Sequence, residues 1–320
     1  MSGETSGETA GEANGEASSE TSGASESATV AALLRTSTLP ALEARILLGH
    51  VLGWRRTELI TRAEEPLDAA KVARWHQLEA RRVAGEPIAQ LVGAREFYGL
   101  EFEVTPHVLI PRPETELLVE TALGAIAGRA RPRVLDLGTG TGAIAVAIAS
   151  VRPDAQVWAI DQSAEALQVA ARNAARLLEA QRPGGPLTLL HGDWYAPLDA
   201  TDALRFDAIV SNPPYIASDD PHLAQGDLRF EPRAALTDEA DGLSAIRSIV
   251  ADAPAWLAAR GVLWIEHGYD QATAVRALLA ARGFHGVRSE CDLAGIERIS
   301  GGELPPSAAS AHTHEIRYHL

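Results

Sequence analysis

Apolar residues in the first third of the chain recur at helical spacing. Over Val30–Val83 they fall three and four residues apart, a pattern that predicts amphipathic helices. Pro40 and Pro66 suit helix starts, and Gly53 suits a helix end. We therefore expect a small all-helical domain over residues 29–86.

The spacing changes after this region. Two short segments, Ile88–Leu91 and Phe97–Val104, are rich in β-forming residues and are interrupted by Gly93 and Gly99. This composition predicts a β-hairpin-like connector over residues 87–112.

Strands and helices then alternate over residues 113–302. Pro113, followed by Glu114 and Glu116, is typical of a helix start, because acidic residues favour the positive end of the helix dipole. Strands are expected at Arg133–Leu137, Gln156–Ile160, Leu187–Leu190, Phe206–Val210 and Gly261–Ile265, and helices at Ala143–Val151, Ala164–Glu179, Leu243–Ala258 and Gln271–Arg282. The alternation predicts an α/β fold whose doubly wound, mostly parallel sheet is covered on both faces. Val287–Cys291 and Glu297–Ser300 are expected to add a closing pair of strands.

Both ends of the chain have a different composition. Residues 1–28 repeat a Ser-Gly-Glu-Thr-like unit, in which frequent glycine opposes a helix, so we expect a disordered acidic tail. Residues 303–320 are expected to form a loose C-terminal tail, with an extra strand at Glu315–Tyr318 as the alternative.

The charge balance and cysteine content narrow the class of protein. The formal net charge is −15, and the first 27 residues contain acids but no base, so a long nucleic-acid footprint is disfavoured. The single cysteine, Cys291, excludes an internal disulfide and a multi-thiolate metal site, and we expect no bound metal. No apolar run reaches the ~18–20 residues of a membrane span, and the start lacks the features of a secretory signal. We therefore expect a cytoplasmic protein.

A glycine-rich loop follows the first strand of the alternating region. In Asp136-Leu137-Gly138-Thr139-Gly140-Thr141-Gly142 the glycines permit a sharp turn and close approach of a ligand, while Asp161 at the end of the next strand suits ribose hydroxyls. Both a nicotinamide dinucleotide and S-adenosylmethionine fit this arrangement. Asp136 favours S-adenosylmethionine, because a carboxylate facing the cofactor suits an ammonium and a sulfonium better than a pyrophosphate.

The tetrapeptide Asn212-Pro213-Pro214-Tyr215 follows the strand at Phe206–Val210. Ligands of open α/β sheets bind at the carboxyl ends of the strands, so this turn is expected to share a crevice with the glycine loop. The Asn212 side-chain oxygen and the Pro213 carbonyl suit the two hydrogens of an amide or aryl amine, and Tyr215 suits its planar group. The pair of motifs predicts transfer of a methyl group to such a nitrogen.

Four further motifs, spread along the chain, resemble those of a known family. With the two motifs above, Gly85–Ile88, Phe97–Gly99, Ile110–Glu116 and Arg229–Leu236 resemble the PrmC/HemK family, from about residue 30 to 302. The resemblance implies a class I methyltransferase sheet, S-adenosyl-L-methionine as cofactor, and methylation at N5 of the glutamine in the Gly-Gly-Gln loop of peptide chain release factors. A release factor would be the partner, and the helical domain its docking site.

The resemblance also implies roles for individual residues. Asn212, Pro213, Pro214 and Tyr215 are the expected catalytic and substrate-binding residues. The expected cofactor-binding residues are Asp136, Gly138, Thr139, Gly140, Thr141, Gly142, Asp161, Asp193, Trp194 and Asn212. Within this set, Asp193 suits the adenine amino group and Trp194 suits packing on its ring.

Several alternatives remain open. An adenine-N6 nucleic-acid methyltransferase would use the same tetrapeptide, although the acidic balance disfavours direct nucleic-acid binding. A nicotinamide-dependent oxidoreductase would leave Asn212 without a role, and a non-catalytic scaffold would not need it. Glu231 is expected either to pair with an arginine or to lie in solvent. Arg112 and Glu116 either line the cofactor pocket or act locally, and Glu266 has no required role in this chemistry.

Overall fold

A computed structural model describes residues 28–198 and 204–306 of the chain. Residues 1–27 of the expected acidic tail and the alternative strand at 315–318 lie outside these residues. Among the described residues, no helix is both long enough and apolar enough to cross a membrane.

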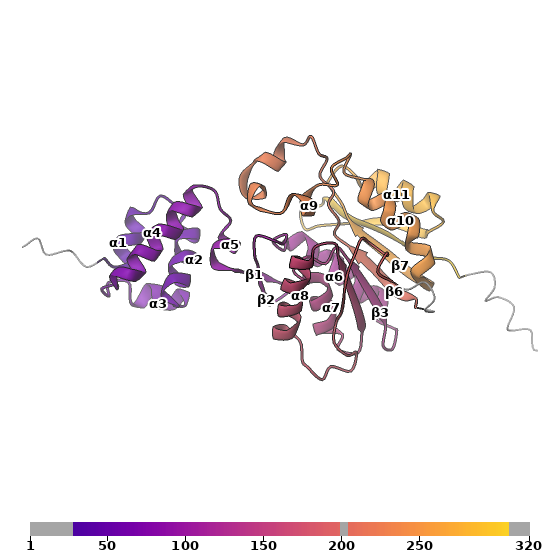
Figure 1. Cartoon of the computed structure of the whole chain (residues 1–320), viewed down its shortest axis with the longest axis horizontal. Coiled ribbons are helices and arrows are strands. Elements are labelled where there is room, and N and C mark those ends of the chain that lie inside the picture. Colours follow the sequence, from indigo (N-terminus) through magenta and orange to yellow (C-terminus); the bar gives the residue numbers. More distant parts are fainter. Residues whose placement is uncertain (1–27, 199–203, 307–320) are drawn as a thin grey trace, which may run out of the picture.

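Five helices pack together at the start of the described chain. They are α1 (Val30–Thr36), α2 (Ala41–Leu52), α3 (Arg56–Thr61), α4 (Ala69–Val83) and α5 (Ile88–Val92). Leu47, Leu48, Trp75 and Leu78 are almost completely buried in a core that belongs to this region alone. Figure 1 shows α1 to α4 grouped at one end of the molecule, with α5 between them and β1. The predicted all-helical N-terminal region is therefore confirmed.

The predicted strand at Ile88–Leu91 is wrong, because these residues form helix α5. Pro87 precedes the first helical residue and Gly93 follows the last, an arrangement typical of short helices. Packing of Ala89 and Leu91 against neighbouring elements outweighs the β propensity of the apolar run. The antiparallel hairpin itself comes later, as β1 (Ala94–Phe97) and β2 (Leu100–Glu103).

A seven-stranded sheet forms the second part of the molecule. Its strands lie in the order β5-β4-β3-β6-β7-β9-β8, and only the pairings made by β9 are antiparallel. The strands are β3 (Arg133–Leu137), β4 (Gln156–Asp161), β5 (Thr188–His191), β6 (Phe206–Ser211), β7 (Leu257–Glu266), β8 (His285–Cys291) and β9 (Glu297–Glu303). The mostly parallel sheet and its antiparallel closing pair are therefore confirmed.

Helices cover both faces of the sheet. The 3-10 turn η1 (Pro113–Thr115) leads into α6 (Glu116–Ile126), which lies with α7 (Ala143–Val151) and α8 (Ala164–Leu177) on one face. The helices α10 (Ser244–Trp256) and α11 (Ala272–Ala281) pack on the other face (Figure 1). The sheet has a hydrophobic core on each face. Side chains alternate along β3, so Val134 packs in the core on the side of α6 and α7, while Leu135 and Leu137 pack in the core on the side of α10 and α11.

The topology creates a natural crevice at the centre of the sheet. Strand β3 pairs with β4 on one side and with β6 on the other, and all three run in parallel. The connections to β4 and to β6 run to opposite sides of β3. The loops at the carboxyl ends of these strands therefore separate and leave room for a ligand. The glycine loop after β3, Asp161 at the end of β4 and the tetrapeptide after β6 all lie at this edge.

A long segment after the tetrapeptide contains η2 (Pro221–Ala224), η3 (Gly226–Phe230) and the short helix α9 (Arg233–Leu236). It returns to its start, because Thr237 forms an isolated bridge with Ile216. On the helical side, Arg82 Nη1 donates to Asp227 at 3.0 Å and Gln90 Nε2 donates to the Phe230 carbonyl at 2.9 Å. This segment therefore connects the helical region to the edge of the sheet where the crevice lies.

Candidate active site

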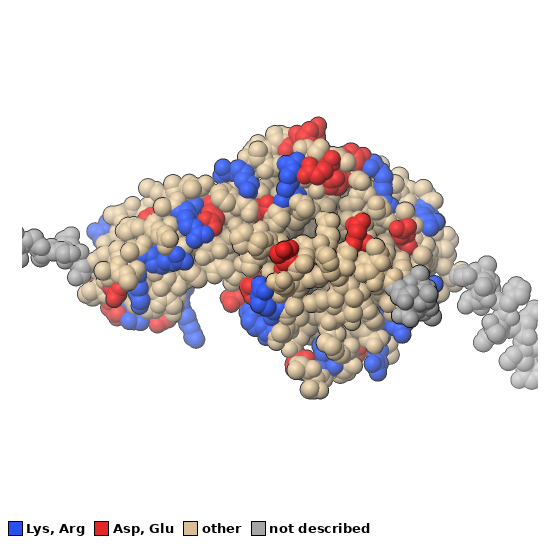
Figure 2. Space-filling model, viewed as in Figure 1, with Lys and Arg blue, Asp and Glu red and all other residues tan. Residues whose placement is uncertain are grey.

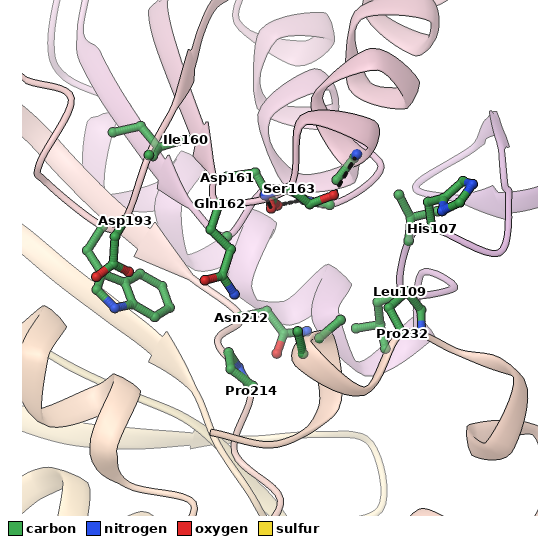
Figure 3. A pocket seen from close by; sticks show the side chains of 18 of the residues that line it. His107, Leu109, Ile160, Asp161, Gln162, Ser163, Asp193, Asn212, Pro214 and Pro232 are labelled. Carbon is green, nitrogen blue, oxygen red and sulfur yellow. Dashed lines mark hydrogen bonds between the residues drawn. The ribbon is translucent and has the colours of Figure 1, made fainter. Parts of the chain in front are cut away.

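A cavity of about 440 Å³ occupies this crevice. In Figure 3, Asp193 lies on one side and His107, Leu109 and Pro232 on the other, with Gln162 and Asn212 between them. The lining residues are Pro106, His107, Val108, Leu109, Gly138, Gly140, Ile160, Asp161, Gln162, Ser163, Ala166, Gly192, Asp193, Trp194, Asn212, Pro214, Pro232, Ala234 and Ala235. Residues from both sequence motifs thus share one cavity.

The glycine loop is held in place by the neighbouring strand. The backbone N–H groups of Gly138 and Thr139 both donate to the Ile160 carbonyl, at 2.9 and 3.0 Å. A Cβ on Gly140 would meet open space, whereas a Cβ on Gly142 would lie 3.1 Å from the Ala170 side chain. Gly142 therefore permits close packing on α8, while Gly140 leaves the cavity side of the loop open to a ligand.

Asp161 connects this loop to the next turn. One carboxylate oxygen accepts from the Gly140 N–H at 2.8 Å. The other accepts from the N–H of Ser163, which lies beside Asp161 in Figure 3, at 2.9 Å. Burial raises the pKa of Asp161, although the hydrogen bonds from Ser163 and Gly140 oppose this shift. The carboxylate is thereby fixed at the cavity wall, where its remaining lone pairs are available to hydroxyl donors.

Asp136 lies elsewhere than expected. Its side chain is fully buried and is not part of the cavity wall, because at this position of β3 it points towards the start of α7. One oxygen accepts from the Thr139 hydroxyl at 2.6 Å, and the other has no hydrogen-bond partner among the described residues. Burial raises the pKa of Asp136 to about 7. In this position the carboxyl group supports the glycine loop from behind, and its expected contact with a cofactor stays a prediction.

The remaining expected cofactor residues divide into two groups. Asp193 is exposed at the rim, and Trp194, which has a positive φ of 41°, lines the wall close to Gly138. Thr139 and Thr141 are buried within the loop and do not line the cavity. The structure therefore brings Gly138, Gly140, Asp161, Asp193, Trp194 and Asn212 together at the cavity, and places the others behind them.

The tetrapeptide Asn212–Tyr215 follows directly after Ser211, the last residue of β6. Asn212 and Pro214 line the cavity, whereas Pro213 is buried and Tyr215 packs partly into the core beneath. Asn212 Nδ2 donates to the Thr115 hydroxyl at 3.2 Å, and the Tyr215 carbonyl accepts from Gln271 Nε2 at 3.0 Å. Burial raises the pKa of Tyr215, so its hydroxyl is neutral and is not a base. The turn is rigid, because two prolines fix its backbone and both ends are bonded.

Two cavity-lining segments were not predicted as site residues. Residues 106–109, together with Pro232, Ala234 and Ala235, form the wall opposite Asp193 (Figure 3). They are joined by Glu231, whose buried carboxylate pairs with Arg112 and accepts from the Ile110 N–H at 2.8 Å. Of the two alternatives for Glu231, the structure shows the pairing with an arginine. Glu116 instead accepts from the Tyr98 N–H at 2.8 Å, a local role at the start of α6.

The arrangement is suited to a nucleoside-bearing ligand beside an amide. Open glycine backbone and the fixed Asp161 carboxylate match a ribose, and Trp194 offers an aromatic surface for a base. A polar amide, Asn212, faces the same space. Among the described residues, no group of three or more His, Cys, Asp or Glu side chains is placed to hold a metal ion. The groups that line the cavity can position such a ligand and form hydrogen bonds with it.

The chain was compared with known families and proteins. The family model described as "PrmC N-terminal domain" matches residues 28–93, and that described as "Methyltransferase small domain" matches residues 113–227. The release factor glutamine methyltransferase of Burkholderia pseudomallei (strain K96243) is 70% identical over 278 residues, which cover 87% of this chain and 97% of that protein. The protein of the same name from Pseudomonas aeruginosa is 48% identical, over 86% of this chain and 98% of its own length.

Two solved structures are also similar to this chain. A release factor-specific protein-(glutamine-N5) methyltransferase from Alicyclobacillus acidocaldarius is 34% identical, covers 64% of this chain and all of its own, and has a TM-score of 0.38. The hMettl16 catalytic domain, in complex with an RNA hairpin, is 12% identical with a TM-score of 0.53, and covers 81% of this chain and 93% of its own. At this low identity the second likeness concerns the fold alone.

Proposed function

Because the chain belongs to the family of release factor glutamine methyltransferases, we propose that it methylates the side-chain amide nitrogen of the glutamine in the Gly-Gly-Gln loop of peptide chain release factors. S-adenosyl-L-methionine, when bound, supplies an electrophilic methyl group on a positively charged sulfur. The observation that supports the proposal most directly is the shared cavity, in which Asn212 and Pro214 face the glycine loop and Asp161. Release factors act in translation, so we propose a cytoplasmic protein.

The glycine loop and its neighbours are the proposed cofactor site. Asp161 accepts the ribose hydroxyls, while Gly138 and Gly140 leave the backbone open to the ligand. Trp194 packs on the adenine ring, and Asp193 at the rim accepts from the adenine amino group. Asp136, Thr139, Thr141 and Gly142 act indirectly in this proposal, by holding the loop in shape.

The tetrapeptide is the proposed substrate site. An amide nitrogen is a weak nucleophile because its lone pair is delocalised into the carbonyl group. Acceptors directed at its two hydrogens orient the nitrogen and favour a pyramidal, more reactive form. The Asn212 side-chain oxygen and the Pro213 carbonyl provide these acceptors, and Tyr215 with Pro214 bounds the planar amide.

A methylation assay tests this proposal. The full chain is incubated with donor labelled in the methyl group and with one of three acceptors: an intact release factor, the same factor with its Gly-Gly-Gln glutamine changed to alanine, or duplex DNA and RNA. We expect label only on the unaltered release factor, located on the glutamine by mass spectrometry. Label on nucleic-acid adenine, with none on the release factor, would support the adenine-N6 alternative instead. On the face shown in Figure 2, Lys and Arg side chains are interspersed with Asp and Glu, which disfavours that alternative.

Donor binding provides a separate prediction. Changing Asp161 to alanine is expected to weaken binding of S-adenosyl-L-methionine by roughly 2–3 kcal/mol, the scale of lost hydrogen bonds to a charged group. The anchor for the Gly140 N–H is lost in the same change. Calorimetry on the full chain measures the effect, and Asp219→Ala, at an exposed position outside the cavity lining, is the matched control, with donor affinity expected to stay the same. Unchanged affinity in Asp161→Ala would remove this residue from the site.

A further inference from the structure

Glu266 is a buried carboxyl group that the chemistry proposed above does not use. It is the last residue of β7, its exposed fraction is 2%, and its Oε2 atom has no hydrogen-bond partner among the described residues. Burial raises the pKa of this group to about 7. A buried carboxyl oxygen without a hydrogen-bond partner is costly, so its presence beside the site calls for an explanation.

The sheet places Glu266 next to the tetrapeptide. Strands β6 and β7 are parallel, and Ser211 pairs with Ile265. The next residue on each strand therefore lies beside the other: Asn212, directly after β6, and Glu266, the last residue of β7. Asn212 Nδ2 donates to the Thr115 hydroxyl at 3.2 Å. Having accepted this bond, the Thr115 hydroxyl still has its own hydrogen to donate. Burial raises the pKa of Glu266 and hydrogen bonding from Thr115 and Asn212 lowers it, in agreement with the position of Asn212 beside Glu266 in the sheet.

The two ends of an asparagine amide have opposite hydrogen-bonding character. Its oxygen accepts and its NH2 donates, whereas the nitrogen of a substrate amide presents only hydrogens to donate. Only the orientation with the Asn212 oxygen towards the cavity is therefore productive. An ionised carboxyl accepts but cannot donate, so it selects the orientation in which the NH2 group and the Thr115 hydroxyl both point towards it.

We propose that Glu266 is a positioning residue that, through Thr115, fixes the Asn212 amide with its oxygen directed at the substrate nitrogen. The inference rests on the proposed function, because the productive orientation is defined by an amide substrate. Glu266 itself touches neither substrate nor cofactor in this scheme. In this scheme Glu266 accepts from the Thr115 hydroxyl, which accepts from the Asn212 NH2 group. The Asn212 oxygen is then left to accept from the substrate nitrogen.

The charge on Glu266 depends on its surroundings. The other ionisable groups around Glu266 and Tyr215 are Glu114, Arg298, Arg112 and His267. Glu114 raises the pKa of Glu266 and Arg298 lowers it. Burial lowers the pKa of His267, whose ring nitrogens are bonded to the Gly268 carbonyl and the Ser300 hydroxyl. Below its pKa Glu266 carries a proton and becomes a donor, so the orienting effect is present at high pH and is lost as pH falls.

A nuclear magnetic resonance titration of the free protein tests the connection directly. The side-chain amide signals of Asn212, assigned by their loss in Asn212→Ala, are expected to shift with pH with a midpoint of about 7 in the unaltered chain. In Glu266→Gln these signals are expected to be independent of pH over the same range. Asp136 also has a pKa of about 7, so a titration that survives in Glu266→Gln would assign the shift to another group and overturn the proposal.

Turnover on a release factor tests the consequence. Glu266→Gln and Thr115→Val are each expected to lower kcat about 10-fold or more, the scale of one well-placed hydrogen bond, with donor affinity unchanged. Thr115→Ser keeps the hydroxyl and is expected to retain most of the rate. In an Asn212→Ala background, Glu266→Gln is expected to cause no further loss.

The outcomes separate the two proposals. Full kcat in Glu266→Gln, or losses that multiply with that of Asn212→Ala, would overturn the positioning role while the methyltransferase activity of the unaltered chain stands. An unaltered chain that leaves release factors unmethylated would overturn the proposed function, and in that case the amide titration still decides whether Glu266 controls Asn212. Donor affinity measured for each variant shows whether it has folded.

Discussion

Turnover on a release factor is expected to fall at least about 100-fold when Asn212 is changed to alanine, the usual scale for loss of one aligned polar group at a reacting centre. The Asn212 NH2 group is engaged by Thr115, which leaves the oxygen as the group available to the cavity. The change to alanine removes this acceptor. The side chains of Pro213 and Pro214 cannot take its place, because prolines have no polar atoms beyond their backbone carbonyls.

Single-turnover kinetics with saturating donor measure the effect, since they separate the reaction from product release. Donor affinity is expected to change only modestly, because most of the proposed cofactor contacts lie on the loops after β3 and β4. Ser218→Ala, at an exposed position on the segment after the tetrapeptide, is the control and is expected to retain full turnover. Near-normal turnover in Asn212→Ala would mean that another group orients the substrate amide.

The sequence predicted the central strands and helices well. The ranges Arg133–Leu137 and Ala143–Val151 coincide with β3 and α7, because a short apolar run, a glycine loop and a longer apolar helix each give a strong local signal. Strand β7 was expected to begin at Gly261 but starts at Leu257, where pairing with Phe206 overrides a helix-like Leu-Ala-Ala-Arg sequence. Local propensity fails there because the deciding contact is distant in sequence.

The site was predictable only in part, for the same reason. Residues that follow strands were placed correctly at one cavity, since the carboxyl ends of adjacent parallel strands meet at one edge. The wall opposite Asp193 depends on the Arg112–Glu231 pair, which joins positions more than a hundred residues apart. The direction in which Asp136 points depends on which helix covers that face of β3, and no pattern in the sequence specifies this.

An intact release factor is expected to be methylated with a kcat/KM at least about 100-fold above that of a short Gly-Gly-Gln peptide. That ratio corresponds to about 2.7 kcal/mol of additional binding in the transition state. A three-residue loop buries far less than the roughly 1,200–2,000 Å² of a specific protein interface, so the enzyme needs contacts outside the cavity. Comparison of the two substrates with the full chain measures this ratio directly.

The helical region is the surface that we expect to provide those contacts. On α2, Leu42 and Ile46 lie one turn apart with exposed fractions of 68% and 40%, an unusual exposure for large apolar side chains. The region is also connected to the segment after the tetrapeptide, through Arg82 with Asp227 and through Gln90 with the Phe230 carbonyl. A partner bound to the helices is thereby held at a defined position relative to the cavity.

Changing both Leu42 and Ile46 to glutamate is therefore expected to lower kcat/KM for the intact factor about 10-fold or more, since desolvated apolar anchors dominate interface energies. The peptide rate and the donor affinity are expected to stay the same, because neither residue lies near the cavity wall. Leu293→Glu is the matched control, because Leu293 is equally apolar and fully exposed but lies in the turn between β8 and β9. Equal rates for peptide and intact factor would refute docking outside the cavity. A large ratio that the double variant leaves unchanged would instead move the docking surface away from α2, to another part of the helical region or to the segment that connects it to the active site.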